Sequence, residues 1–137
     1  MGLVYADLIL RNATDVTNTK RGLMKDDEIR QMPVTAMVDT GSINLVINEA
    51  VRKQLGLTLE DSREATLADG SKCKFSHTEP VQIQWKNRKA VLQAIYIPTA
   101  DEILLGAIPL EALDLIVNPL KQELTGAHGE EMVLIIK

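Results

Sequence analysis

Aromatic residues are scarce in this sequence, at 3% of 137 positions, with one tryptophan, two tyrosines and one phenylalanine. A core must therefore be filled mainly by valine, isoleucine and leucine, and branched aliphatic side chains favour β-strands. The single cysteine, Cys73, excludes an internal disulfide. Because isolated cysteines are typical of reducing compartments, we expect a cytoplasmic protein.

Long apolar runs and an excess of positive charge are also missing. No run approaches the roughly 20 residues that span a membrane, and Asp7 comes too early for a signal peptide, so we expect no membrane partner. The net charge of -4 leaves no basic stripe to neutralise phosphates, which argues against nucleic-acid binding. His77 and His128 lack metal-ligand spacing with Cys73, so we predict neither a metal nor another cofactor.

What remains is an ordinary globular composition, with 45% hydrophobic and 25% charged residues. The length fits one domain covering residues 1–137. Alternating apolar residues and buried apolar runs predict many short strands. These strands are expected at residues 3–11, 29–38, 45–47, 64–67, 72–75, 81–85, 89–97, 103–106, 114–124 and 132–136.

Few helices are expected between these strands. Asn48 can cap a helix that Gly56 ends, and residues 109–113 can form a second short helix with proline near its first turn. The polar stretch 12–27 is interpreted as an exposed loop. Many short strands with turn signals and little helix predict an all-β barrel.

One motif suggests chemistry. The apolar stretch 34–38 leads directly into Asp39-Thr40-Gly41-Ser42, so a buried strand delivers a carboxylate to a tight turn. Gly41 is expected to allow a backbone conformation that a side chain would block. A rigid, hydrogen-bonded carboxylate suits a catalytic group. The alternative is that Asp39 merely begins an Asx-type turn at a strand end.

The context of this motif resembles the retropepsin-like aspartic proteases of clan AA, including the single-domain kind found in bacteria and archaea. Residues 43–47 lead to a short helix that ends at 55–57. A hairpin with residues 67–70 at its tip lies where the family places its flap. Residues 103–106, followed by 108–110, are similar to the family's hydrophobic-hydrophobic-glycine element. The resemblance covers roughly residues 3–124.

The resemblance implies a closed acid-protease barrel with one or two short helices, assembled as a C2 homodimer. In such dimers two Asp-Thr-Gly loops meet at the two-fold axis, and this chain has one such motif. The implied activity is that of an aspartic endopeptidase acting on peptide or protein substrates, with Asp39 of each copy as the catalytic residue. Two alternatives stay open: an inactive protease-like module that dimerises or binds peptides, and an unrelated barrel with an accidental motif.

The resemblance also assigns supporting roles around the catalytic residue. Thr40 would hydrogen-bond across the dimer axis and hold the two loops together. Gly41 would allow close approach of backbone, water and substrate, and Ser42 would orient the carboxylate. Leu105 and Gly106 would pack behind the catalytic loop.

A flap is the other element that the resemblance implies. Ala68, Asp69, Gly70 and Ser71 would close over an extended substrate and pair with its backbone as an added strand. The last predicted strand, at 132–136, is either an interface strand or an ordinary internal one, and the sequence assigns no role to residues 125–137.

Overall fold

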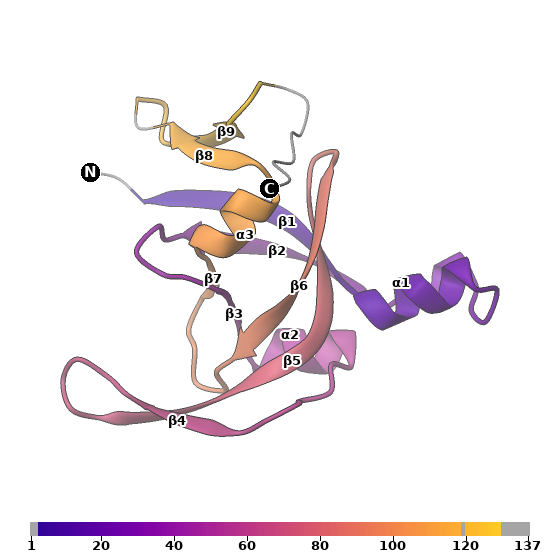
Figure 1. Ribbon diagram of the computed structural model, residues 1–137, viewed down its shortest axis with the longest axis horizontal. Coiled ribbons are helices and arrows are strands. Elements are labelled where there is room, and N and C mark those ends of the chain that lie inside the picture. Colours follow the sequence, from indigo (N-terminus) through magenta and orange to yellow (C-terminus); the bar gives the residue numbers. More distant parts are fainter. Residues whose placement is uncertain (1–2, 119, 130–137) are drawn as a thin grey trace, which may run out of the picture.

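The structure, a computed structural model, describes residues 3–118 and 120–129 and is built mainly of strands (Figure 1). The strands are β1 (Val4–Asn12), β2 (Gln31–Val38), β3 (Leu45–Ile47), β4 (Arg63–Thr66), β5 (Lys72–Trp85), β6 (Arg88–Tyr96), β7 (Ile103–Leu105), β8 (Leu115–Asn118) and β9 (Glu123–Gly126). The helices are α1 (Ala13–Lys20), α2 (Glu49–Leu55), α3 (Ala107–Ala112) and a 3-10 turn, η1 (Asp26–Glu28). None of these described helices is long and apolar enough to cross a membrane.

Six strands close into a barrel. The sheet has the order β1-β2-β7-β3-β6-β5-β4, and β1 pairs additionally with β5, which joins the two sides of the sheet. Strand β4 is attached outside this ring, to β5, and β8 and β9 form a separate hairpin. The predicted closed all-β barrel is therefore confirmed, with three short α-helices where one or two were expected.

Branched aliphatic side chains fill the core, as the shortage of aromatic residues predicts. Alternate residues of β1 point inward, so Leu8 and Leu10 are 2% and 0% exposed. Leu45, Ile83 and Leu105 come from other strands of the barrel and are fully buried. Each such side chain contributes about 1.5–3 kcal/mol when it leaves water, so the hydrophobic interior holds the strands together.

The predicted helix at 49–55 is confirmed with its caps. The Asn48 side chain accepts a hydrogen bond from the Val51 N–H at 3.2 Å, and Gly56 ends the helix in the left-handed region at a φ of 60°. These caps satisfy backbone groups that the helix leaves unpaired.

The predicted loop over residues 12–27 is wrong, because this stretch forms α1 and η1. Buried Asn12 caps α1 by accepting a hydrogen bond from the Asp15 N–H at 3.1 Å. The buried Asp15 carboxylate accepts hydrogen bonds from Arg30 Nε and Nη2 at 2.8 and 2.9 Å. The Arg30 side chain thereby lowers the pKa of Asp15. Polar contacts, rather than an apolar stripe, hold this helix.

Strand boundaries differ from the prediction in two places. The predicted strand at 114–124 is the β8–β9 hairpin, because the Asn118 side chain accepts hydrogen bonds from the backbone N–H groups of Leu120 and Lys121 and turns the chain. The two strands expected at 72–75 and 81–85 are one strand, β5, with a register shift between His77 and Pro80. The predicted strand at 132–136 lies outside the described residues.

Candidate active site

Asp39 lies at the carboxyl end of β2 and is half-buried. Its backbone N–H donates to the Leu105 carbonyl at 3.0 Å, and its own carbonyl accepts from the Ser42 N–H at 3.0 Å. Its side-chain Oδ1 accepts from the Gly41 N–H at 3.0 Å, which is the geometry of an Asx turn. Among the described residues nothing donates to Oδ2, so one carboxylate oxygen is fixed and the other is available.

A segment from the other end of the chain holds this loop from behind. The N–H groups of Gly106, Ala107 and Ile108 donate to the carbonyls of Asn44, Ser42 and Ile43 at 3.0, 2.9 and 2.9 Å. A Cβ at Gly106 would lie 2.6 Å from the Asn44 oxygen and 2.7 Å from backbone atoms of the two preceding residues. Only glycine therefore allows the two backbones to approach this closely.

The structure places Leu105 and Gly106 directly behind the Asp39 loop. Leu105 is fully buried and pairs with Val38 in parallel register and with Leu45 in antiparallel register. The short strand β7 thus lies between the strand that enters the loop and the strand that leaves it. This arrangement fixes where the Asp39 carboxylate emerges from the barrel.

Gly41 lies two residues after Asp39 and is exposed. Its φ lies outside the left-handed region, so the prediction that this position needs a backbone conformation special to glycine is wrong. A Cβ at Gly41 would lie 3.3 Å from Asp39 Oδ1, inside ordinary contact distance. Glycine here keeps the space beside the carboxylate free.

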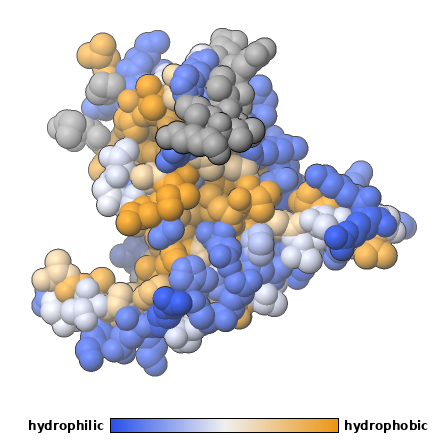
Figure 2. Space-filling view, viewed as in Figure 1, coloured by the Kyte–Doolittle hydropathy of each residue, from blue (hydrophilic) through white to orange (hydrophobic). Residues whose placement is uncertain are grey.

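Thr40 is exposed and lines a pocket of about 800 Å³. The other walls come from α3, β8 and residues 127–128, and most of them are apolar. Ile108 and Ile116 on these walls are 49% and 52% exposed. Figure 2 shows the apolar surface over α3. The Asp39 loop therefore borders an apolar area in which Ile108 and Ile116 are half-exposed.

The predicted flap residues lie at the tip of the β4–β5 hairpin. Gly70 has a φ of 87° and its N–H donates to the Leu67 carbonyl, which closes the turn. Asp69 Oδ1 accepts hydrogen bonds from the Ser71 hydroxyl and N–H, at 2.6 and 2.9 Å, and these bonds lower the pKa of Asp69. Ala68 is exposed beside them. In Figure 2 a notch separates this hairpin from the rest of the molecule.

Comparison with known proteins now identifies the family. Residues 26–132 match the family model described as "gag-polyprotein putative aspartyl protease". The chain belongs to this family. No curated protein matches the sequence.

Two solved structures have folds similar to that of this chain. The EIAV protease, complexed with the inhibitor HBY-793, has a TM-score of 0.54 at 15% identity, over 80% of this chain and 86% of that one. The retroviral protease-like domain of Ddi1 from Leishmania major has a TM-score of 0.58 at 13% identity, over 91% of this chain and 88% of that one. At such low identity these likenesses establish the fold, and they confirm the expected retropepsin-like barrel.

The structure also brings together polar residues that no pattern in the sequence connects. Asp61 and His77, sixteen residues apart, form a side-chain pair at the base of the β4–β5 hairpin. Buried Arg88 contacts Asp114, which also binds His128. Within residues 3–118 and 120–129, no three His, Cys, Asp or Glu side chains are grouped to hold a metal ion.

Proposed function

We propose that the protein is an aspartic endopeptidase in which two copies of the chain hydrolyse a peptide bond. The supporting observation is the Asp39 loop, whose carboxylate projects from a backbone fixed by the residues around Gly106. Membership of an aspartyl protease family points to the same chemistry. Each copy would supply one Asp39 carboxylate, and one water molecule would lie between the two.

The mechanism follows from the electrostatics of two neighbouring carboxylates. Both cannot ionise cheaply within a few ångströms of each other, so they share one proton, as aspartic protease dyads do in general. The ionised Asp39 would take a proton from the water, and the protonated Asp39 of the other copy would hydrogen-bond the scissile carbonyl. No covalent intermediate is required. Because the pair titrates as a unit, we expect activity to be favoured below neutral pH.

A second copy is required because each chain carries one Asp-Thr-Gly motif. The apolar area beside Thr40 offers a surface for it, since Ile108 and Ile116 are half-exposed there. Strand β8 pairs with β9 on one side, and its other edge has no strand partner in the described part of the chain. We therefore place the homodimer contact on the α3–β8 face, which would let Thr40 of each copy bond across the axis.

Substrate would bind as an extended peptide below the flap. Among the described residues β4 pairs with β5 alone, so residues 63–75, which carry Ala68 to Ser71, extend beyond the barrel strands. The backbone of such a hairpin can pair with an extended peptide as an added strand. The notch between the hairpin and the barrel leaves room for it (Figure 2).

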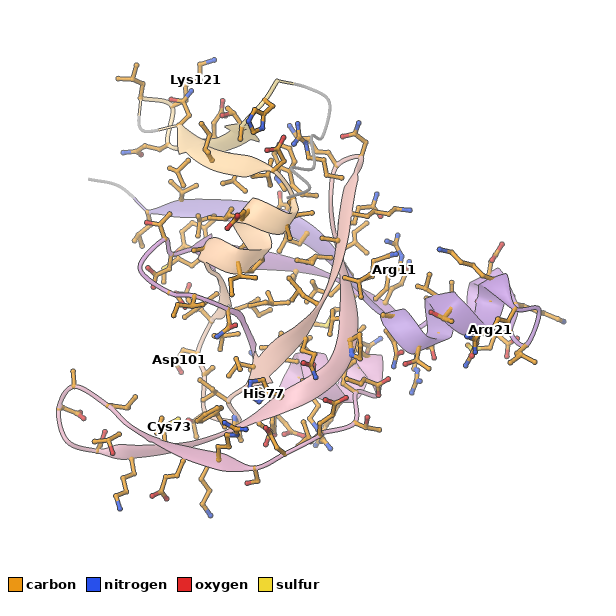
Figure 3. All side chains as sticks on the ribbon, viewed as in Figure 1. Arg11, Arg21, Cys73, His77, Asp101 and Lys121 are labelled. Carbon is orange, nitrogen blue, oxygen red and sulfur yellow. The ribbon has the colours of Figure 1, made fainter. Side chains whose placement is uncertain are left out.

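An Asp39→Asn variant tests this proposal. Asparagine keeps a side-chain oxygen for the Gly41 N–H, so folding and self-association should be nearly unchanged. Cleavage of a peptide library between pH 4.5 and 7.5 should be abolished, because the dyad loses its charge. The matched control is Asp101→Asn, an exposed residue that is labelled in Figure 3, and it should cut like the parent protein. Wild-type protein that dimerises but cuts nothing would instead favour the inactive peptide-binding module.

A further inference from the structure

The flap hairpin is held to the barrel at its base. Strand β4 pairs with β5 and with no other strand among the described residues. Figure 1 shows the hairpin projecting from the barrel on the side where the loop between β2 and β3 lies. The direction of a hairpin that lacks other support is decided by the bonds at its base. Those bonds therefore determine how the flap stands relative to Asp39.

Asp61 is the centre of these bonds. It lies two residues before β4, and its Oδ1 accepts from the His77 backbone N–H at 2.7 Å. Its Oδ2 lies 2.8 Å from His77 Nδ1 and also accepts from Arg63 Nε at 3.1 Å. One carboxylate thus joins the segment entering β4 to the strand that leaves the flap. His77 is labelled on that strand in Figure 3.

The backbone around this pair strengthens the connection. The Glu60 N–H donates to the His77 carbonyl at 2.8 Å, and the Glu79 N–H donates to the Thr58 carbonyl at 2.9 Å. The register of β5 shifts between His77 and Pro80, directly after the pair. After this shift β5 pairs with β1 and β6 of the barrel. Before it, Ser76 and His77 still pair with β6, and residues 72–75 pair with β4 in the hairpin.

We propose that Asp61 and His77 are positioning residues that set the flap over the Asp39 loop, and that protonation of His77 tightens this clamp in mild acid. The catalytic consequence rests on the proposed peptidase function, whereas the clamp itself is measurable without any cleavage. It supplies a second acid-dependent element, remote from the Asp39 pair.

Protonation should tighten the clamp because it changes which nitrogens of the His77 ring can donate hydrogen bonds. A neutral imidazole donates from Nδ1 in one tautomer only, whereas the protonated ring donates from both nitrogens. Protonation also places a positive charge beside the carboxylate, so Coulomb attraction adds to a bond that already has an ionised acceptor. The pKa of Asp61 is lowered, first by the His77 backbone N–H and then by the ring. The carboxylate therefore stays ionised in mild acid, where histidine side chains take up protons.

The charged residues beside the Asp61–His77 pair include Arg63 and Glu60. Arg63 is the cation that faces His77 from the β4 side, and it shares Asp61 with the ring. The Glu60 carboxylate is engaged by the Gln93 side chain. Protonated His77 therefore has Asp61 as its nearest anion, with Arg63 as a competing donor for one oxygen.

The other described contacts of His77 are with an aromatic residue, an engaged carboxylate and an apolar residue. On its own strand Phe75 contacts it edge-on, with ring centroids 6.1 Å apart. The Glu79 carboxylate is occupied by two hydrogen bonds from Thr58, at 2.7 and 2.9 Å. The facing residue of β6 is Ile95, which is apolar. Within residues 3–118 and 120–129, the ring thus has an aromatic neighbour, an apolar one and Asp61 as its carboxylate partner.

Hydrogen exchange of the flap amides tests the clamp. Exchange of residues 63–75 would be measured at pH 5.0 and 7.5 and corrected for intrinsic rates. In the wild-type protein we expect protection to rise about three- to tenfold at pH 5.0. His77→Gln should remove this rise, and Asp61→Asn, which keeps an acceptor for the backbone N–H, should remove it as well. The matched control is His128→Gln, which changes the chain's other histidine and should keep the wild-type response.

The outcomes separate the clamp from the peptidase function. If His77→Gln retains the wild-type pH response, or loses protection equally at both pH values, the clamp is overturned and His77 has a structural role only. A wild-type response in protein that cuts no peptide supports the clamp while refuting the peptidase. Where cleavage occurs, His77→Gln should raise KM in mild acid with little change in kcat, because a loosened flap holds substrate less well.

Discussion

Replacing Gly106 by alanine tests whether the Asp39 loop depends on the close approach of two backbones. The added Cβ would lie 2.6 Å from the Asn44 oxygen and 2.7 Å from Ile43 and Ser42 backbone atoms. Non-bonded atoms prefer about 3.5 Å or more, so the loop must move by about 0.9 Å. All three neighbours are backbone atoms, so no side chain can rotate away to make room.

The cost of that movement can be worked out from its parts. Forcing an extra methyl into a packed site costs about 1–3 kcal/mol. Three hydrogen bonds join residues 106–108 to the loop, and weakening one of them costs about 1 kcal/mol more. We therefore expect Gly106→Ala to lower the free energy of unfolding by about 3 kcal/mol. With an m-value of about 2 kcal/mol per molar urea, the midpoint falls by about 1.5 M.

Urea denaturation at one protein concentration measures this effect, and Gly70→Ala is the matched control. Gly70 has open space around its Cβ position but a φ of 87°, so alanine there suffers backbone strain of about 1 kcal/mol and no clash. Its midpoint should fall by about 0.5 M. A Gly106→Ala midpoint that falls no further than that of the control would refute the argument, because the cost would then be ordinary loss of glycine.

Two further predictions concern stability and assembly. Asp15→Asn should lower the free energy of unfolding by about 2 kcal/mol at pH 7, since Asp15 is buried and Arg30 is half-exposed. The pKa of folded Asp15 is lowered, so this stabilisation is present above the ordinary carboxyl pKa and disappears as pH falls through the folded value. Urea midpoints of parent and variant should therefore converge as the pH falls below the ordinary carboxyl pKa, and a constant gap would contradict the ion pair. Ile116→Asp should weaken self-association at least about 100-fold in sedimentation velocity, because the two-fold axis brings two buried charges together. Val91→Asp, at a residue 58% exposed on β6, should sediment like the parent, and an equal effect of both variants would move the interface elsewhere.

Local patterns in the sequence predict much of this fold. The alternation of β1 buries Leu8 and Leu10 as expected, and the caps at Asn48 and Gly56 begin and end α2 where expected. Both signals act within a few residues of the chain, so the sequence carries them completely. Gly106 can also be recognised from the local sequence, although glycine is required there by a contact with a loop about sixty residues earlier in the chain.

Other features depend on contacts that no local pattern carries. Helix α1 has no apolar stripe, and it is held by Asp15 bonding to Arg30 and by the Asn12 side chain donating to the Leu55 carbonyl at 2.9 Å. The Asp61–His77 pair forms because the flap strands align residues sixteen apart. Its place at the flap base becomes visible only with the register of β5. Polar residues of this kind look like solvated loop residues until the fold brings their partners close.

The same separation of local and long-range causes bears on why an aspartate stands at position 39. The N–H groups of residues 106–108 hold the loop by bonding to the backbone carbonyls of residues 42–44. These bonds do not depend on which side chains the loop carries. Asp39 contributes one side-chain acceptor, to Gly41, and an asparagine or serine could supply that too. Folding therefore has no need of a negative charge there, and a module that only bound peptides would need no more than the loop's shape. Hydrolysis by a pair of carboxylates does require a negative charge at this position, held on a loop with a fixed backbone and open space beside it. This supports the peptidase over the binding module, and it is why a neutral residue of the same shape at position 39 is the decisive substitution.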